Sequence, residues 1–231
     1  MSLQTMIATS ETEFIRTAAN ETARHINKNI ASRGQCLVGL SGGSTPGPVY
    51  NALVALPIEW AKVFLFLVDE RYVPANEKES NQRLIRETLL SVARIPEKNL
   101  LFPDTTLPYD RCAASYDQVL SKKFRDSTPD LVILGMGEDG HIASLFPPLA
   151  DDDALDPQHA IISTETDRFA VRRRISATLP VLASARSCMF LLKGEAKQKV
   201  WQEMTQSKED ERRWPAKRII RDTQCIALFC P

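Results

Sequence analysis

Two hydrophobic patterns alternate along the chain. Short continuous apolar runs are typical of strands buried on both faces of a parallel sheet, whereas apolar residues three or four positions apart are typical of helices that pack on such a sheet. The strand pattern occurs at 36–40, 63–68, 100–102, 131–134, 161–163, 175–179, 188–192 and 226–229. The helix pattern occurs at 11–30, 46–56, 80–93, 110–124 and 195–204. The alternation predicts an α/β fold: a doubly wound, mainly parallel sheet with helices on both faces, a three-layer α/β/α arrangement of the modified Rossmann-like kind.

The alternation continues through the chain without an obvious domain boundary. No internal repeat or low-complexity tract occurs, and the polar stretches 76–80 and 151–157 are short enough to be loops inside one domain. A chain of 231 residues is an ordinary size for an α/β domain. We therefore expect one domain that spans residues 1–231.

Charge is balanced, with 29 Lys and Arg against 29 Asp and Glu. Without a net field, neither nucleic acid nor a membrane surface is expected as a partner, and affinity for an anion must come from a local cluster. The apolar runs are far shorter than the ~20 residues of a membrane-spanning helix, and the N-terminus lacks the pattern of a signal peptide. We expect a cytoplasmic protein that binds a small molecule and is a monomer or a homodimer.

The cysteines and histidines do not indicate a metal site. Five cysteines are dispersed among mostly apolar neighbours, which favours reduced, packed thiols over a disulfide framework. Neither C-x-x-C nor H-E-x-x-H spacing occurs, and His25, His141 and His159 are far apart in the sequence. These spacings do not match those of zinc sites, so we expect no bound metal.

One segment, 130–147, joins a buried-type strand to a glycine-rich turn with the sequence DLVILGMGEDGHIASLFP. Ligands of parallel α/β sheets bind beyond the carboxyl ends of the strands, so we place the chemistry at this turn. Its glycines let the backbone turn sharply and approach a ligand, and they bring Asp139 and His141 to the rim. The simpler alternatives are that His141 is a satisfied polar residue of a tight turn and that Asp139 only caps this turn.

Two short motifs suggest other functions, but their contexts argue against both. Residues 135–140 match the dinucleotide motif G-x-G-x-x-G, yet Pro147 and Pro148 would end a following helix after about two turns, and dinucleotide binding needs a full crossover helix. Residues 39–43 match the serine-hydrolase motif G-x-S-x-G around Ser41. This would be the first strand of the sheet, with no earlier strand loop to donate the second oxyanion N–H. We therefore expect neither NAD(P) or FAD binding nor a serine nucleophile.

The turn LSGGSTPGP has the composition of an anion site. Gly42 and Gly43 open the turn, Ser44 or Thr45 can cap the following helix, and Pro46 suits its first position. Backbone N–H groups at such a helix N-terminus form a cradle for an anion. The alternative is a plain strand-to-helix turn that is rich in glycine.

The next predicted strand supports the anion site. Asp69, Glu70 and Arg71 follow the run 63–68 directly, at the same edge of the sheet as the glycine turns. Three charged residues after a buried strand are costly unless they are paired or face a polar cleft. Asp69 and Glu70 are either part of the cleft or partners that position Arg71.

Together these segments resemble 6-phosphogluconolactonases, which share a fold with glucosamine-6-phosphate deaminase and ribose-5-phosphate isomerase. The resemblance covers residues 36–201 and is carried, in order, by LSGGSTP, VDERYVP, SNQRL, LGMGEDGHIASLFP and RRISATLPVLASARSCMFLLKGEAK. It implies hydrolysis of 6-phosphoglucono-δ-lactone to 6-phosphogluconate in the oxidative pentose phosphate pathway. It also implies that neither a metal nor an organic cofactor takes part.

The resemblance also implies roles for individual residues. The catalytic group comprises His141, Asp139 and Arg71. The substrate and phosphate group comprises Gly42, Gly43, Ser44, Thr45, Asp69, Asn81, Arg174 and Lys197. Arg172 and Arg173 precede Arg174, so that assignment depends on the register. The family pattern fades near the C-terminus, at Lys217 and at 226–230, which leaves the closing side of the site undefined.

The reaction that the resemblance implies asks little of the protein. A δ-lactone is an activated ester, so one general base, an anchored substrate and some oxyanion stabilisation suffice. His141 is expected to take a proton from the attacking water and to return it to the ring oxygen. Asp139 holds either the imidazole or the turn, and Arg71 steadies either the phosphate or the oxyanion.

Two other functions are compatible with the same fold. Glucosamine-6-phosphate deaminases and related isomerases resemble the chain, but they have a Tyr where this chain has Arg71 and an acidic residue that is missing from 144–147. Sugar-responsive regulators of this fold keep the phosphate-binding groups, but we expect them to lack the catalytic histidine and to carry a DNA-binding module. This chain has His141, and we expect no appended module in it.

Overall fold

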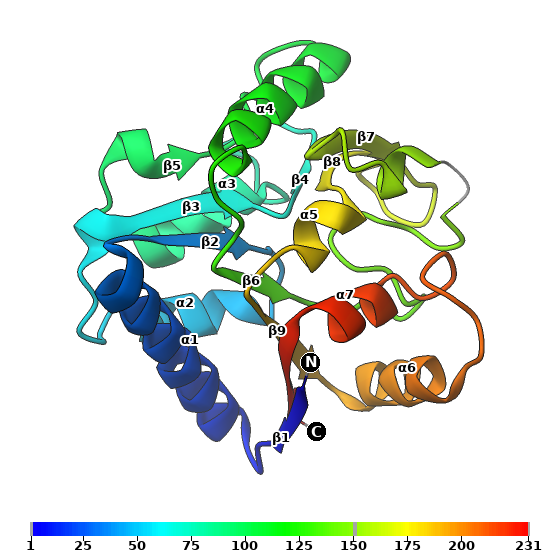
Figure 1. Cartoon of the computed structure of the whole chain (residues 1–231), viewed down its shortest axis with the longest axis horizontal. Coiled ribbons are helices and arrows are strands. Elements are labelled where there is room, and N and C mark those ends of the chain that lie inside the picture. Colours follow the sequence, from blue (N-terminus) through cyan, green and yellow to red (C-terminus); the bar gives the residue numbers. More distant parts are fainter. Residues whose placement is uncertain (1, 150–151, 231) are drawn as a thin grey trace.

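A seven-stranded parallel sheet forms the centre of the molecule (Figure 1). The structure is a computed structural model, and it describes residues 2–149 and 152–230. The sheet has the order β1-β10-β9-β6-β2-β3-β5, and every neighbouring pair is parallel. Its strands are β1 (Leu3–Ile7), β2 (Cys36–Leu40), β3 (Val63–Leu67), β5 (Leu100–Leu101), β6 (Leu131–Leu134), β9 (Ser187–Lys193) and β10 (Gln224–Cys230).

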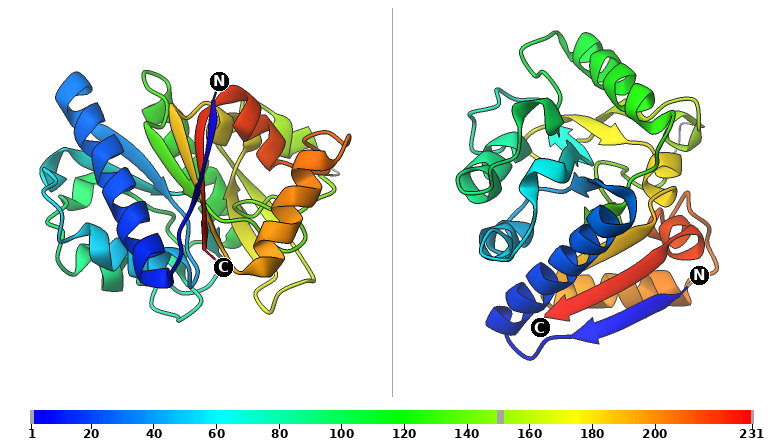
Figure 2. Two further views of the ribbon diagram at one scale, coloured as in Figure 1. Left: turned by 90° about the horizontal axis from the view of Figure 1, so that it is seen from below. Right: turned by 60° about the vertical axis from the view of Figure 1, so that its left-hand side comes forward.

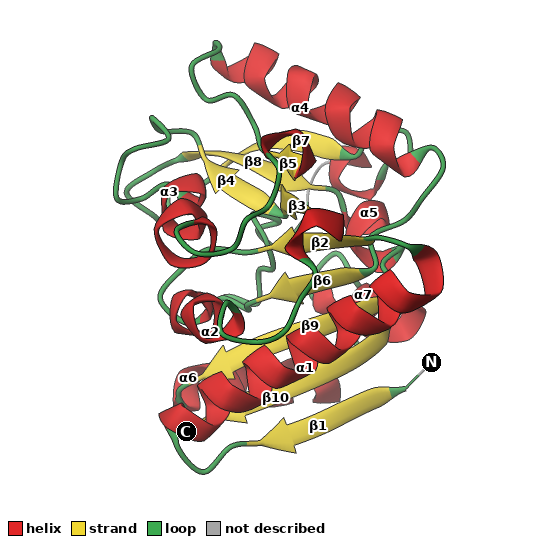
Figure 3. Cartoon of the chain, turned by 90° about the vertical axis from the view of Figure 1, so that its left-hand side faces the viewer, coloured by secondary structure: helices red, strands yellow, loops and turns green. Residues whose placement is uncertain are grey.

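Helices cover both faces of this sheet, and each face has its own apolar core. One face packs against α1 (Glu11–Arg33), α2 (Pro46–Leu53), α3 (Asn81–Ile85) and the π-helical turn η2 (Arg86–Leu90). The other packs against α4 (Tyr109–Phe124), α5 (Leu179–Ala183), α6 (Glu195–Gln206) and α7 (Ala216–Asp222). Short 3-10 turns are η1 (Trp60–Lys62), η3 (Glu97–Asn99) and η4 (Asp152–Leu155). The predicted three-layer, doubly wound fold is confirmed; Figure 2 shows α1 (blue) across the sheet from α6 and α7 (orange and red), and Figure 3 shows the layers.

A second, antiparallel sheet was not predicted. It consists of β4 (Asp69–Arg71), β8 (Arg173–Ala177) and β7 (Ile161–Glu165), in the order β4-β8-β7. Val68 joins the two sheets, because its N–H donates to Leu40 and its carbonyl accepts from Ala177. The prediction that 161–163 and 175–179 belong to the parallel sheet is therefore wrong, and Leu179 begins α5 instead.

Several other boundaries differ from the predictions for local reasons. The predicted helix 80–93 is divided into α3 and η2, and α2 ends at Leu53. β1 was missed because it is an exposed edge strand without an apolar run. No helix follows β6 within 135–149; Gly140 and Ala143 adopt positive φ there, which interrupts helical geometry. The predicted loop 151–157 begins outside the described residues, and its next four residues form η4.

Two further features concern the cysteines and the helices. All five cysteines are buried and unpaired, which confirms the prediction of free thiols. Among the helices of residues 2–149 and 152–230, none is long and apolar enough to cross a membrane. The single-domain interpretation stays a prediction.

Candidate active site

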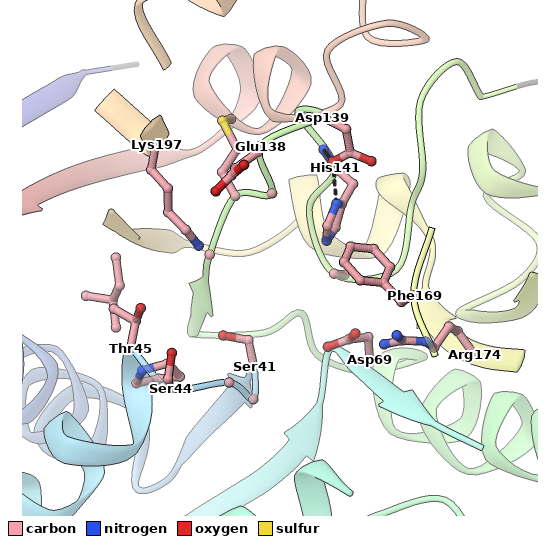
Figure 4. A pocket seen from close by; sticks show the side chains of 18 of the residues that line it. Ser41, Ser44, Thr45, Asp69, Glu138, Asp139, His141, Phe169, Arg174 and Lys197 are labelled. Atoms are coloured by element: carbon pink, nitrogen blue, oxygen red, sulfur yellow. Dashed lines mark hydrogen bonds and ion pairs between the residues drawn. The ribbon is translucent and has the colours of Figure 1, made fainter. Parts of the chain in front are cut away.

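A cavity of about 560 Å³ lies where the carboxyl ends of β2, β3 and β6 meet. Figure 4 shows side chains from separate turns and strands converging on it. It contains every predicted site residue except Asn81. The lining residues that the sequence singled out are Gly42, Gly43, Ser44, Thr45, Asp69, Arg71, Asp139, His141, Arg174 and Lys197.

The turn after β2 forms one wall of the cavity. Tyr50 is fully buried and its hydroxyl donates to the carbonyl of Ser41 at 2.8 Å, which fixes the start of the turn. Gly43 has a φ of 104°, a conformation that favours glycine. Thr45 occupies the N-cap position of α2 but is already helical, and its side chain makes no capping hydrogen bond. The expected capping role is therefore wrong for Thr45, whose side chain lines the cavity together with Ser44.

A buried carboxylate fixes the neighbouring wall. Glu70 is completely buried, and its oxygens accept from the backbone N–H groups of Arg71, Asn81 and Gln82 at 2.7–2.8 Å and from the Ser80 hydroxyl at 3.2 Å. Burial raises the pKa of Glu70 to about 7, against these donors, which favour the ionised form. Glu70 thus ties β4 to the start of α3 and positions Arg71 without lining the cavity.

Asn81 lies behind the glycine turn. Its amide donates to the carbonyl of Asp69 at 2.8 Å and to Asp69 Oδ1 at 3.3 Å. A Cβ on Gly42 would lie 1.8 Å from Asn81 Oδ1, so only glycine fits there. Asp69 Oδ2 accepts from the hydroxyl of Ser144 at 2.7 Å. In the structure Asn81 supports Asp69 and the turn without lining the cavity, and its contact with substrate stays a prediction.

Three of the predicted cationic residues line the cavity, and they come from different elements. Arg71 and Arg174 lie opposite each other in the β4–β8 register. Burial, and then the charge of Arg71, lower the pKa of Arg174, and burial lowers the pKa of Lys197. Figure 4 shows Lys197 on the side of Ser44 and Thr45, whereas Arg174 lies beside Asp69.

The register of the three consecutive arginines is now clear. Arg172 and Arg173 are exposed and form ion pairs with Asp167 and Glu165. Arg174 is buried, donates from Nε to the carbonyl of Val171 at 2.8 Å, and lines the cavity. Of the three arginines, only Arg174 faces the cavity.

Asp139 and His141 form a hydrogen-bonded pair in the turn after β6. Nδ1 of His141 lies 2.5 Å from Asp139 Oδ1, which also accepts the backbone N–H of His141 at 3.1 Å. Burial opposes ionisation of Asp139, but its hydrogen bonds with His141 and its pairing with Arg168 hold its pKa well below the usual range. An ionised Asp139 fixes the proton of a neutral imidazole on Nδ1 and leaves Nε2 as the acceptor. The ring projects into the cavity (Figure 4).

The sequence analysis missed several side chains of the cavity, among them Glu138, Arg168 and Phe169. Glu138 stands within the recognised motif, but nothing in its residue type separates it from a solvated turn residue. Arg168 and Phe169 belong to the connection between β7 and β8. Irregular loops have no periodicity that reports which way a side chain points, so the sequence carried no signal for them.

The geometry also bears on the two alternative motifs. β1 precedes β2 in the chain, so the premise that β2 is the first strand is wrong. β1 lies at one edge of the sheet, with β10, β9 and β6 between it and β2. Within the described residues, the Ser41 hydroxyl makes no hydrogen bond to His141, whose Nδ1 is engaged by Asp139. Among the same residues, no cluster of three or more His, Cys, Asp or Glu side chains has a metal-binding arrangement.

Comparisons with known proteins agree on one family. A family profile described as glucosamine-6-phosphate isomerases/6-phosphogluconolactonase matches residues 9–227. A probable 6-phosphogluconolactonase of Dictyostelium discoideum is 41% identical over 199 residues, which cover 84% of this chain and 84% of that protein. The solved 6-phosphogluconolactonase of Thermotoga maritima aligns with a TM-score of 0.88 at 26% identity and covers 100% of both chains. That of Plasmodium vivax gives 0.89 at 27% identity, with 98% of this chain and 90% of that chain covered.

We predict that Ser41→Ala retains most of the hydrolytic activity. Within the described residues the Ser41 hydroxyl has no hydrogen bond to an imidazole, so the arrangement that activates a serine nucleophile is missing there. Steady-state hydrolysis of the lactone, corrected for spontaneous opening, measures the effect. Complete inactivation of a folded variant, or an acyl-serine adduct found by mass spectrometry, would reinstate the serine-hydrolase mechanism.

Proposed function

The chain belongs to the family of glucosamine-6-phosphate isomerases and 6-phosphogluconolactonases, and we propose that it hydrolyses 6-phosphoglucono-δ-lactone with His141 as the general base. The relatives named above carry the name 6-phosphogluconolactonase, and the alignments cover 84–100% of their lengths. This favours lactonase activity over the deaminase and sensor alternatives. The observation that carries the mechanism is the Asp139–His141 pair, which presents an imidazole acceptor to a cavity with cationic walls.

In the proposed first step, Nε2 of His141 takes a proton from a water molecule as its oxygen attacks the lactone carbonyl. Asp139 holds the ring in the tautomer that this step needs and stabilises the imidazolium that forms. In the second step the imidazolium returns the proton to the ring oxygen as the C–O bond breaks. The product is 6-phosphogluconate, and one imidazole serves as both base and acid.

Arg71 is proposed to stabilise the oxyanion that develops on the carbonyl. Arg71 lines the cavity, and its guanidinium is held in place because Nη1 donates to the carbonyl of Glu79 at 2.7 Å. A fixed cation costs little reorganisation at the moment of reaction, which is what oxyanion stabilisation requires. No metal is part of the proposed mechanism.

The phosphate of the substrate is proposed to lie against the turn formed by Gly43, Ser44 and Thr45, with Lys197 facing it and Arg174 approaching from the side of Asp69. Pro46 and Pro48 have no N–H group, so the first turn of α2 offers few backbone donors. The hydroxyls of Ser44 and Thr45 and the cationic side chains must therefore supply most of the hydrogen bonds to the phosphate. We further propose that the enzyme works in the cytoplasm.

We predict that His141→Ala lowers kcat by roughly 10²–10⁴, the usual contribution of a positioned acid–base group. Binding of 6-phosphogluconate should persist, because the phosphate groups remain. His159→Ala is the matched control: this half-exposed histidine pairs with Asp117 outside the cavity, and its loss should leave turnover unchanged. Near-normal turnover of folded His141→Ala would refute the assignment of the base.

We also predict that glucono-δ-lactone without the phosphate is a poorer substrate by on the order of 10³-fold in kcat/KM, because two or three charge-assisted hydrogen bonds are lost. Arg174→Ala should weaken hydrolysis of the phosphorylated lactone selectively. Arg173→Ala, which removes the exposed neighbour, is the control and should change neither lactone. Equal loss of both activities in Arg174→Ala would place this arginine at the carbonyl instead of the phosphate.

A further inference from the structure

The loop between β7 and β8 lies over the catalytic turn and is closed at its base. The N–H of Thr166 donates to the carbonyl of Arg172 at 3.1 Å, and the N–H of Arg168 donates to the Thr166 hydroxyl at 3.2 Å. Thr166 is buried, so these contacts hold the loop from inside. The arrangement places Arg168 and Phe169 against the turn that carries the catalytic pair.

Arg168 completes the hydrogen bonding of Asp139. Its Nη1 is paired with Asp139 Oδ2, while Asp139 Oδ1 is engaged by His141. Its Nη2 donates to the carbonyl of Pro147 at 3.2 Å, in the segment that leaves the catalytic turn. The carboxylate is therefore held at both oxygens, and it cannot rotate without breaking a charged hydrogen bond.

Phe169 ties the same loop to the imidazole and to the cationic wall. Its ring centroid lies 5.6 Å from that of His141 in an edge-on arrangement, and Phe146 packs on the imidazole with a centroid distance of 4.9 Å. The guanidinium of Arg174 lies 5.5 Å from the centroid of Phe169. The imidazole of His141 thus contacts Phe169 of the loop directly. Asp139 also links the imidazole to Arg168 of the same loop.

We propose that Arg168 is a positioning residue of the reaction: it fixes the orientation of Asp139 and offsets the negative charge that this carboxylate places on the imidazole. The proposal rests on the function proposed above for His141. A guanidinium suits the task, because its fork reaches the Asp139 carboxylate and the Pro147 carbonyl together. Phe169 of the same loop packs edge-on against the imidazole.

Other charges also face the pair, so the effect of Arg168 must be separated from theirs. Arg213 donates to the backbone carbonyl of Asp139 at 3.0 Å, and Glu138 precedes Asp139 in the turn. The remaining charged side chains of the cavity are Asp69, Arg71, Arg174 and Lys197. Arg168 differs from these other groups because its guanidinium forms an ion pair with the Asp139 carboxylate.

The test is kinetic and uses Arg168→Ala, Arg168→Lys and the control Arg172→Ala, an exposed arginine of the same loop whose ion pair is with Asp167. For Arg168→Ala we expect kcat to fall on the order of 10-fold or more, with little change in KM for the phosphorylated lactone. The acidic limb of the kcat/KM profile should move to higher pH, because an uncompensated Asp139 favours the imidazolium. Arg168→Lys should restore part of kcat, and Arg172→Ala should behave as the wild type.

A double-mutant cycle with Asp139→Asn distinguishes positioning from a general structural role. If Arg168 acts through Asp139, adding Arg168→Ala to Asp139→Asn should cost little further activity. Full additivity, a rise in KM alone, or an unchanged pH profile in folded Arg168→Ala would overturn the proposal. The proposed function fails separately, if His141→Ala remains active; an inactive His141→Ala with a normal Arg168→Ala refutes only the positioning role.

Discussion

The site depends on one topological constraint: β2 and β6 are neighbours in the sheet, but the chain leaves them toward opposite faces. Crevices form at such a switch point, outside the carboxyl ends of the strands. The turn that follows β2 and the turn that carries Asp139 and His141 therefore face each other across the cavity. The proposed anion-binding wall and the proposed catalytic wall arise together, from the way the sheet is wound.

The small antiparallel sheet supplies what the parallel sheet lacks. β4 continues from β3 and pairs with β8, which brings Arg71 and Arg174 side by side at the cavity. The positive charges of Arg71 and Arg174 repel each other, so buried hydrogen-bond acceptors must hold the two strands in this arrangement. Glu70 anchors the backbone around Arg71, and Asp69 is held by Asn81 and Ser144. The cationic wall is thus built on buried carboxylates.

The sequence was informative where burial or a motif determined the outcome. The continuous apolar runs gave Cys36–Leu40 and Leu131–Leu134 with the correct ends, and the glycine turns beyond them line the cavity. The sequence was uninformative where pairing between distant segments determined the secondary structure. The charged residues 69–71 have no strand pattern of their own, and they form a strand because they pair with β8. Arg168 could not be predicted for a related reason: its role depends on where a loop folds back.

The most direct test is a crystal structure with 6-phosphogluconate bound. We expect the product carboxylate to lie within hydrogen-bond distance of His141 Nε2, because its carbon was the lactone carbonyl. The phosphate should contact the hydroxyls of Ser44 and Thr45 and the ammonium of Lys197. A reversed product, with its phosphate at His141, or one bound outside the cavity, would contradict the central claim that this winding of the sheet presents the lactone carbonyl to the Asp139–His141 pair.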